Sequence, residues 1–482
     1  KGIMHEIPAQ SKLFLGHHKH LQGSAFSTGF LFDLAHVFQI LDDPFQDFNA
    51  TILMDDFTAS ELSAYADKAY GGEKFDVKEV APVRAVDENT YCLELWHGPT
   101  CAFKDMALQM LPQLLSAALR KTGEKRTACI LVATSGDTGK AAMEGFADVP
   151  QTCIQVYYPK NGVSAVQEQQ MVTQEGKNVD VRAVIGNFDD AQSGVKRIFS
   201  DEAIRAELDK RGYFLSSANS INWGRILPQV VYYISAYCDL VRSGAIAMGD
   251  KVNFCVPTGN FGDILAAYYA KHMGLPVGKL ICASNSNNVL TDFLRTGIYD
   301  RNRPFHTTVS PSMDILISSN LERLLFHFSG ENDEEVQGYM DALSKTGRYE
   351  VSDAIKAKLA DEFWGGFCTE AATETTIGRY KKDYGYLIDT HTAVAAEVMD
   401  QYRTATGDRT PTVFVSTASP YKFCGAVLTA IGETPKGDGV ELLDQLHEVS
   451  GVAVPRRRRA ASRCLLLPGW AGQRPVSENC SV

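Results

Sequence analysis

The sequence lacks long hydrophobic runs, CxxC cysteine pairs and an excess of positive charge, and each absence narrows the possible functions. No apolar segment approaches the roughly 18 residues of a membrane-spanning helix, and no convincing signal peptide is visible. We therefore expect a cytoplasmic protein that does not bind membranes. The net charge of −11 argues against nucleic-acid binding, which requires a basic surface. The 11 cysteines are scattered and odd in number, which predicts reduced thiols, not a disulfide framework or a zinc site.

The rest of the composition is typical of a soluble α/β enzyme. At 482 residues the chain should form more than one lobe, and its 45% apolar and 22% charged residues are near globular averages. Strand-like runs alternate with helical stretches, which favours a largely parallel sheet with ligands beyond the C-terminal strand ends. These runs are Ile130–Ala133, Ile154–Tyr158, Val252–Val256, Leu280–Ala283 and Val413–Ser416. His17, His18 and His20 are more typical of an exposed loop than of a metal site, and we expect no metal.

One lysine follows a Gly-Pro turn at the start of an apolar segment. In His97-Gly-Pro-Thr-Cys-Ala-Phe-Lys-Asp105, Lys104 lies between Phe103 and Met106-Ala-Leu108. A lysine that forms a Schiff base must lose its proton, and a desolvated site favours that loss. Most lysines beside apolar residues only extend their stems along a surface, so this segment alone leaves both interpretations open.

Two further segments have the composition of anion-binding loops. Ala133-Thr-Ser-Gly-Asp-Thr-Gly-Lys140 follows a strand-like run and precedes a helix expected from Ala141 onward, and Val256-Pro-Thr-Gly-Asn-Phe-Gly-Asp263 follows another strand. The first amides of a helix are unpaired and its dipole favours negative charge. In the second loop the two glycines would allow positive φ and close backbone approach. Neither loop has the GxGxxG or Walker pattern, and either one could be an ordinary strand-to-helix connection.

A Schiff-base lysine together with a phosphate loop suggests pyridoxal 5′-phosphate as cofactor. The pyridine nitrogen then needs a partner, and the late strand-like run ending in Ser416 and Thr417 offers hydroxyl groups. A hydroxyl there would leave the ring nitrogen largely unprotonated. Taken in isolation, this segment could equally be a Ser/Thr-rich loop that caps the next helix.

At this point the chain resembles the threonine synthases of the bacterial and fungal branch. Blocks that match the family in order begin with Glu94-Leu-Trp-His-Gly-Pro-Thr100 and Phe103-Lys-Asp105. They continue with Ser135–Gly139, Asn219–Arg225, Gly259–Asp263, Pro311–Ile315 and Ser416–Pro420. The resemblance extends from about residue 51 to about residue 455, and several ordered blocks are far more specific than any single one.

The resemblance implies an α/β fold of the tryptophan-synthase-β type, which is fold type II among pyridoxal-phosphate enzymes. Two α/β lobes would surround a cofactor cleft, preceded by an N-terminal domain. We expect residues 1–90 to form that domain, residues 91–440 the catalytic core and residues 441–482 a C-terminal segment. Similar enzymes suggest a monomer or a weak homodimer.

The resemblance also assigns site residues. Lys104 would hold the cofactor as a Schiff base and then shuttle protons, and Thr417, in preference to Ser416, would face the ring nitrogen. The cofactor phosphate would be bound by Gly259, Asn260, Phe261, Gly262 and Asp263. The substrate would meet Ser135, Gly136, Asp137 and Thr138 at its carboxylate, and Asn219, Ser220, Asn222 and Arg225 at its phosphate.

Other charged residues are weaker candidates. Arg225 is the preferred phosphate ligand because a guanidinium binds phosphate in a bidentate fork; Lys160 and Lys422 are more typical of solvated lysines. We expect His97 to shape the turn before Lys104 and His391 to pack at a helix start. The acidic run 331–335 predicts a helix N-terminus.

The implied reaction converts O-phospho-L-homoserine and water to L-threonine and phosphate by γ-elimination and β-hydration. One alternative is a threonine or serine dehydratase, or a phospho-lyase, that releases a 2-oxo acid. Another is a non-catalytic binding protein of the same fold, which the intact Lys104 and the two loops disfavour. Product analysis separates the enzymes, and a borohydride-sensitive imine absorbance separates them from the binding protein.

Both ends depart from the family. Residues 1–50 lack its Ser-Thr-Arg opening and its Pro-Asp-Gly-Gly-Leu turn, and residues 456–459 form an Arg-Arg-Arg-Arg run. A basic tail could bind an acidic partner. We expect instead a reading-frame change or a fragmentary gene prediction at both ends, with residues 456–482 frame-shifted or disordered.

Overall fold

The computed structural model describes residues 56–456, apart from residues 135, 161, 164, 221 and 438. The chain folds into two compact units, each assembled from separate stretches of sequence. The first unit contains residues 56–66, 79–96 and 220–434, and the second contains residues 67–78, 97–219 and 435–456. Helix α4 (Ala59–Tyr70) contributes residues to both.

The first unit is built on a six-stranded sheet with the order β1-β2-β12-β7-β8-β11. Its neighbours pair in parallel except β1, which is antiparallel to β2. β7 and β12 are buried along their whole length, as expected for central strands covered on both faces. The strands are β1 (Val83–Asp87), β2 (Thr90–Glu94), β7 (Val252–Pro257), β8 (Val277–Ser284), β11 (Phe363–Phe367) and β12 (Thr412–Ser416).

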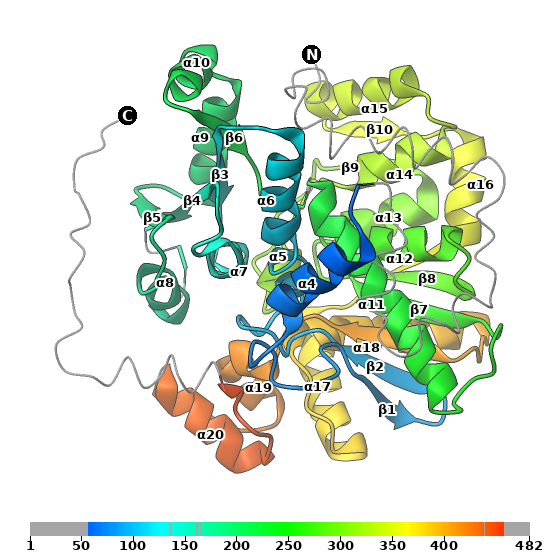
Figure 1. Cartoon of the computed structure of the whole chain (residues 1–482). Coiled ribbons are helices and arrows are strands. Elements are labelled where there is room, and N and C mark those ends of the chain that lie inside the picture. Colours follow the sequence, from blue (N-terminus) through cyan, green and yellow to red (C-terminus); the bar gives the residue numbers. More distant parts are fainter. Residues whose placement is uncertain are drawn as a thin grey trace. The chain divides into compact units, whose positions relative to one another are not determined.

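Helices cover this sheet, and α12 and α18 both pack against β7 and β8 (Figure 1). A small antiparallel pair, β9 (Ile298–Asp300) and β10 (Arg348–Glu350), lies outside the main sheet. The helices are α11 (Trp223–Arg242), α12 (Gly262–His272), α13 (Val289–Thr296), α14 (Leu321–Phe328), α15 (Asp333–Thr346), α16 (Asp353–Glu362), α17 (Glu370–Tyr384), α18 (Thr390–Thr406) and α19 (Cys424–Ala430), with 3₁₀ turns η1 (Pro311–Met313) and η2 (Pro420–Lys422).

The second unit is built on a four-stranded parallel sheet with the order β5-β4-β3-β6. Leu131 and Ala133 of β3 pack against Ala191 and Val195 of α9. The strands are β3 (Thr127–Ala133), β4 (Thr152–Pro159), β5 (Val179–Val184) and β6 (Tyr213–Ser216). The helices are α5 (Lys104–Leu108), α6 (Leu111–Thr122), α7 (Asp137–Phe146), α8 (Ala165–Val172), α9 (Phe188–Ser200), α10 (Glu202–Lys210) and α20 (Val440–Ser450).

The strand-like runs named from the sequence all lie within strands, and the predominantly parallel pairing is confirmed. The acidic run 331–335 leads into α15, where Asn332 caps the helix and Asp333 begins it, as predicted. One boundary was wrong: α7 begins at Asp137, four residues before the expected Ala141. The domain limits at residues 90 and 440 stay predictions, and both atypical ends lie almost entirely outside the described residues.

The nine cysteines in the described part of the chain are all free thiols, which agrees with the expectation of reduced cysteines. Most are buried, and burial raises the pKa of several, such as Cys282 to about 12. No helix among the residues described here is long and apolar enough to cross a membrane. No group of three or more potential metal-ligating side chains occurs there either, while His17, His18 and His20 lie outside that part.

Candidate active site

The turn before Lys104 is held by a buried carboxylate. Asp105 is fully buried and accepts hydrogen bonds from the backbone N–H of Thr100 (2.7 Å) and from its hydroxyl (2.8 Å). A Cβ on Gly98 would lie 2.7 Å from the Asp105 carboxylate, so only glycine leaves room for this closure. The turn ends at Lys104, the first residue of α5. Thr100 and Asp105 were missed as turn-forming residues, although both stand in the motif that drew attention to the lysine.

Lys104 lies in a largely desolvated setting, as the sequence predicted. Its side chain is 13% exposed, and its Nζ lies 3.9 Å from Oδ2 of Asp137 at the start of α7. A close approach of α5 and α7 supports this pairing, because a Cβ on Gly145 would overlap the carbonyl oxygen of Leu108. Gln167 donates to the other carboxylate oxygen (3.1 Å). The structure therefore places the predicted Schiff-base lysine beside one predicted substrate-binding residue.

In the loop that leads into α7, a single hydroxyl satisfies two backbone amides. Thr134 Oγ1 accepts hydrogen bonds from Gly136 N–H (3.0 Å) and Gly139 N–H (2.9 Å). Gly136 has a φ of 134°, which favours glycine. Two backbone N–H groups of this loop are thus already hydrogen-bonded within the loop. Ser135, predicted to bind substrate, lies outside the described residues.

The loop that leads into α12 leaves its amides open. Among the described residues, no acceptor meets any N–H group from Gly259 through Asp263. The sequence prediction of positive φ at the two glycines was wrong: neither Gly259 nor Gly262 adopts it, and Phe261 does, with φ 62°. Phe261 is buried against Phe363, with ring centroids 5.6 Å apart, and this packing stabilises the conformation. The result is a run of free amides at a helix N-terminus, which is an anion-binding arrangement.

A second segment braces that loop from outside. A Cβ on Gly259 would lie 3.2 Å from both the Cα of Met313 and the carbonyl oxygen of Ser312, so this glycine is required by the approach of turn η1. Ser318 Oγ donates to the Gly259 carbonyl (3.1 Å), and the backbone N–H of Asn320 donates to the Asn260 carbonyl (3.1 Å). Ser318 and Asn320 were not identified from the sequence. Their only signal was a polar run shortly after the block that begins at Pro311.

The carboxylate of Asp263 does not serve as a free anion at this loop. Tyr232 donates a very short hydrogen bond to its Oδ1, and Tyr233 donates to the same atom (2.6 Å). Burial raises the pKa of Asp263 to about 6, while the two tyrosine hydroxyls act in the opposite direction. At neutral pH this carboxylate is still largely ionised, and the two tyrosine hydroxyls offset part of its negative charge beside the loop. Only the backbone N–H of Asp263 can be a phosphate ligand.

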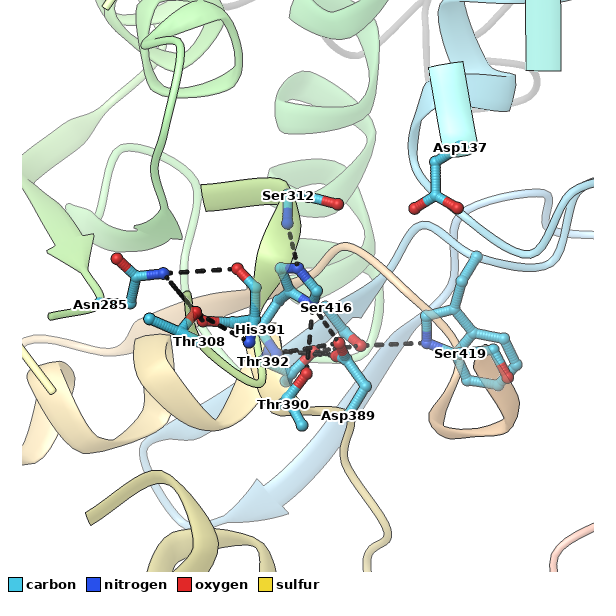
Figure 2. Close-up of polar contacts among 12 residues, drawn as sticks. Asp137, Asn285, Thr308, Ser312, Asp389, Thr390, His391, Thr392, Ser416 and Ser419 are labelled. Atoms are coloured by element: carbon cyan, nitrogen blue, oxygen red, sulfur yellow. Dashed lines mark hydrogen bonds and ion pairs between the residues drawn. The ribbon is translucent and has the colours of Figure 1, made fainter. Parts of the chain in front are cut away.

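Asp314 organises the block that contains η1. Its Oδ1 accepts hydrogen bonds from Asn285 (2.7 Å), Asn287 (3.0 Å) and the Thr308 hydroxyl (2.7 Å), and its Oδ2 accepts from Thr308 N–H (3.0 Å). The Asn285 amide also donates to the Thr308 hydroxyl (2.9 Å), a contact that Figure 2 shows. These contacts explain why an aspartate follows the Pro311-Ser312-Met313 turn.

The end of β12 separates the two hydroxyls that compete for the ring nitrogen. Trp96 Nε1–H donates to Ser416 Oγ (3.0 Å), and a hydrogen bond of 2.9 Å joins Ser416 Oγ to Thr392 Oγ1. Thr392 Oγ1 is the donor in that bond, so Ser416 Oγ accepts from both Trp96 and Thr392. Two side chains thus hold the Ser416 hydroxyl in place, whereas Thr417, the candidate preferred from the sequence, is 6% exposed.

The remaining predicted residues lie at the start of α11. Asn222 caps this helix, since its Oδ1 accepts from Gly224 N–H (2.9 Å), and Arg225 is 3% exposed in the first turn. Burial lowers the pKa of Arg225 to about 10, which still leaves it protonated at neutral pH. The hydroxyls of Ser220 and Ser319 lie 3.3 Å apart. Ser220, Asn222 and Arg225 belong to the first unit and Asn219 to the second.

The candidate residues are thus divided between the two units. The second unit contains Lys104, Gly136, Asp137, Thr138 and Asn219. The first unit contains the open amides of residues 259–263, the Thr417 hydroxyl and the residues at the start of α11. Lys160 is exposed and Lys422 half-buried, and the carbonyl of His97 accepts from Asp76 N–H (2.9 Å).

Comparison with known proteins identifies relatives of this chain. The family model of the threonine synthase C-terminal region matches residues 392–454. The chain is 42% identical over 384 residues to threonine synthase-like 1 of Homo sapiens, covering 78% of this chain and 51% of the human protein. It is 42% identical over 377 residues to threonine synthase of Pseudomonas aeruginosa, covering 78% and 77%. The crystal structure of pyridoxal-phosphate-bound threonine synthase from Brucella melitensis matches with a TM-score of 0.76 and 36% identity over 89% of each chain.

The parallel α/β units and their lysine and glycine loops define the fold of type II pyridoxal-phosphate enzymes. Within that class, the chain belongs to the threonine synthase family, which confirms the resemblance found in the sequence blocks. It spans about half the length of the threonine synthase-like 1 proteins that it matches.

Proposed function

We propose that this protein is a pyridoxal-phosphate-dependent threonine synthase, which converts O-phospho-L-homoserine and water to L-threonine and phosphate. The observation that carries the proposal is the pair of complementary groups: a largely buried lysine at a helix start, and a strand-to-helix loop with unpaired amides. The Brucella melitensis relative has pyridoxal phosphate bound, and its fold matches over most of this chain.

The residues present fit this cofactor. Lys104 would form the Schiff base, the N–H groups of residues 259–263 would bind the phosphate, and the Thr417 hydroxyl would meet the ring nitrogen. A hydroxyl partner suits an unprotonated pyridine, and no carboxylate is assigned to that position. When bound, the cofactor supplies an electron sink that lets protons leave the carbons next to the substrate amine.

The protein's own groups would then manage protons and charge. Lys104, when it is not bound to the cofactor, would be a base that can take the proton from the substrate α-carbon and return protons later. Asp137, 3.9 Å from the lysine nitrogen, would stabilise the ammonium form between these transfers. The loop residues Asp137 and Thr138, next to Gly136, would bind the substrate carboxylate. Arg225, still cationic despite burial, is the proposed ligand of the substrate phosphate.

Water access distinguishes this reaction from its alternative. Threonine formation requires water to add at the β-carbon, whereas hydrolysis before that addition would release 2-oxobutyrate. The second candidate function is therefore a phospho-lyase, which would release that 2-oxo acid from the same substrate. We further propose that the protein is cytoplasmic, which suits its free thiols. We also propose that it is a monomer or a weak homodimer.

The deciding experiment identifies the product. Purified protein is incubated with pyridoxal phosphate and O-phospho-L-homoserine, and amino acids and 2-oxo acids are quantified. L-Threonine in equal amounts with released phosphate supports the proposal. 2-Oxobutyrate as the main product would support the phospho-lyase. No turnover, with no imine absorbance, would leave only a non-catalytic protein of this fold.

A further inference from the structure

The carboxylate of Asp389 is the centre of a buried hydrogen-bond network in the first unit. It is fully buried and caps α18. Oδ1 accepts from the backbone N–H (3.0 Å) and the hydroxyl of Thr392. Oδ2 accepts from the backbone N–H (2.9 Å) and Nδ1 (2.8 Å) of His391. Four donors fill the acceptor capacity of an ionised carboxylate, so Asp389 has nothing left to offer a ligand.

This arrangement fixes the tautomer of His391. Because Asp389 can only accept, Nδ1 of His391 must carry the proton in the 2.8 Å bond. The other ring nitrogen, Nε2, then has a free lone pair, and it accepts from the backbone N–H of Ser312 (3.2 Å). Figure 2 shows the imidazole bonded to Asp389 on one side and to Ser312 on the other. Both bonds require the neutral ring protonated at Nδ1.

The Ser312 bond has a structural target. Ser312 and Met313 belong to turn η1, whose backbone comes so close to Gly259 that a Cβ there would lie 3.2 Å from each. Gly259 opens the loop with the unpaired amides. His391 therefore holds the turn that backs the phosphate loop, although it is far from that loop in sequence. The ring itself is 3% exposed and packs against Phe423.

We propose that His391 and Asp389 are positioning residues for the cofactor phosphate: Asp389 sets the His391 tautomer, and His391 holds η1 against the loop of residues 259–263. This inference rests on the proposed function, since it concerns the same phosphate. Neither residue touches the ligand. Their contribution is the preorganisation of the amides that do.

A role limited to packing makes a different prediction, and two substitutions separate the possibilities. In His391→Gln, the side-chain carbonyl can take the place of Nε2 and accept from Ser312, while the bond to Asp389 is lost. In His391→Asn, the amide can take the place of Nδ1 and donate to Asp389, while the bond to Ser312 is lost. Both variants remove the same ring from Phe423.

The experiment measures the affinities of pyridoxal phosphate and of pyridoxal, which lacks the phosphate, by titrating the imine absorbance. His391→Asn should weaken pyridoxal phosphate binding about ten-fold, the upper range for one hydrogen bond, and leave pyridoxal binding unchanged. His391→Gln should stay within about two-fold of wild type. The control is His447→Gln, which should change neither affinity. His447 lies in α20 of the second unit, where its ring bonds the Val452 carbonyl.

Asp389→Asn provides an independent variant. Asparagine is as good a helix cap as aspartate, but two of the present four donors must then face an NH₂ group, because each oxygen of Asp389 accepts from two of them. If the asparagine side chain turns its NH₂ group toward His391, the imidazole must accept at Nδ1 and carry its proton on Nε2. The Nε2–H group then faces the N–H of Ser312, and the hydrogen bond to η1 is lost. Pyridoxal phosphate binding should weaken as in His391→Asn, and the preference over pyridoxal should fall with it.

The outcomes separate this inference from the function beneath it. If wild type forms no imine with pyridoxal phosphate, the proposed function fails and the positioning role fails with it. If wild type forms the imine but His391→Gln and His391→Asn behave alike, or both ligands weaken together, only the positioning role is overturned. Thermal unfolding of each variant shows whether it is folded. Where a His391 variant is not folded, pyridoxal phosphate binding by Asp389→Asn decides whether the positioning role holds.

Discussion

Two strand-to-helix loops of this protein begin alike and end differently. One begins with Thr134 after β3, and the other begins with Thr258 after β7. The N–H of Thr134 donates to the carbonyl of Tyr157 in β4 (2.9 Å), and the N–H of Thr258 donates to the carbonyl of Ala283 in β8 (2.8 Å). The hydroxyls then point opposite ways. Thr134 Oγ1 accepts from amides further along its loop, whereas Thr258 Oγ1 donates back to the Val256 carbonyl (2.7 Å).

The direction of that one hydroxyl decides what each loop can bind. The first loop satisfies Gly136 and Gly139 internally, so fewer amides remain for an anion. The second leaves a run of five amides, from Gly259 to Asp263, with no acceptor in the described structure, and depends on η1 for support. A phosphate needs several convergent donors, so the second loop suits the cofactor phosphate and the first suits a carboxylate.

The largest expected effect concerns the carboxylates that follow the loops. Asp137 pairs with Lys104, whereas burial raises the pKa of Asp263 from 3.8 to about 6. Between pH about 4 and about 6, the folded protein therefore keeps a proton on Asp263 that the unfolded chain has released. As the pH rises through this range, the contribution of Asp263 to the free energy of unfolding falls. The fall is on the order of 3 kcal/mol.

Urea unfolding of the cofactor-free wild type and Asp263→Asn tests this effect. The variant should gain stability relative to wild type between pH about 4 and about 7, because its amide still accepts from the tyrosines without a charge. A difference in unfolding free energy that stays constant with pH would show that Asp263 is ionised throughout, and the contrast with Asp137 would be lost.

Gly259→Ala should produce the next largest effect. Its Cβ would lie 3.2 Å from backbone atoms of both Ser312 and Met313, which cannot move cheaply, so the loop must shift at a cost of about 2 kcal/mol. Pyridoxal phosphate affinity should fall about thirty-fold, with a smaller loss for pyridoxal. The matched control is Gly338→Ala in α15, where a Cβ meets nothing within 4 Å. Equal losses for both ligands would contradict a phosphate-specific loop.

Thr134→Val should have the smallest effect. It should lower the free energy of unfolding by about 1 kcal/mol, because it removes one hydrogen-bond acceptor from a helix start. Amide hydrogen exchange should accelerate about five-fold at Gly136 and Gly139. Thr258→Val, the matched change in the other loop, should leave exchange of residues 259–263 as fast as before. If those amides are protected in the cofactor-free wild type, they are not open, and the comparison fails.

Much of this arrangement was predictable from local sequence. Apolar runs identified the central strands, and the Gly-Pro turn before Lys104 identified the lysine together with its buried setting. Both predicted anion loops occur as strand-to-helix connections at the expected positions, after β3 and after β7. These features depend on neighbouring residues, so a short stretch of sequence contains the information.

What escaped prediction depends on contacts between distant segments. The sequence assigned the freedom of the second loop to its glycines, yet the positive φ belongs to Phe261, which is held by packing on Phe363. Likewise Gly259 is needed because η1 approaches it, and Ser416 is distinguished from Thr417 only by Trp96 and Thr392. No local pattern reveals partners that lie tens to hundreds of positions away.

The most direct test of the whole account locates the cofactor on the chain. Protein loaded with pyridoxal phosphate is reduced with borohydride, digested and analysed by mass spectrometry, in parallel with Lys104→Ala. The account predicts a pyridoxyl-phosphate adduct on Lys104 in wild type and no adduct in the variant. An adduct on another residue of wild type, or none at all, would contradict it.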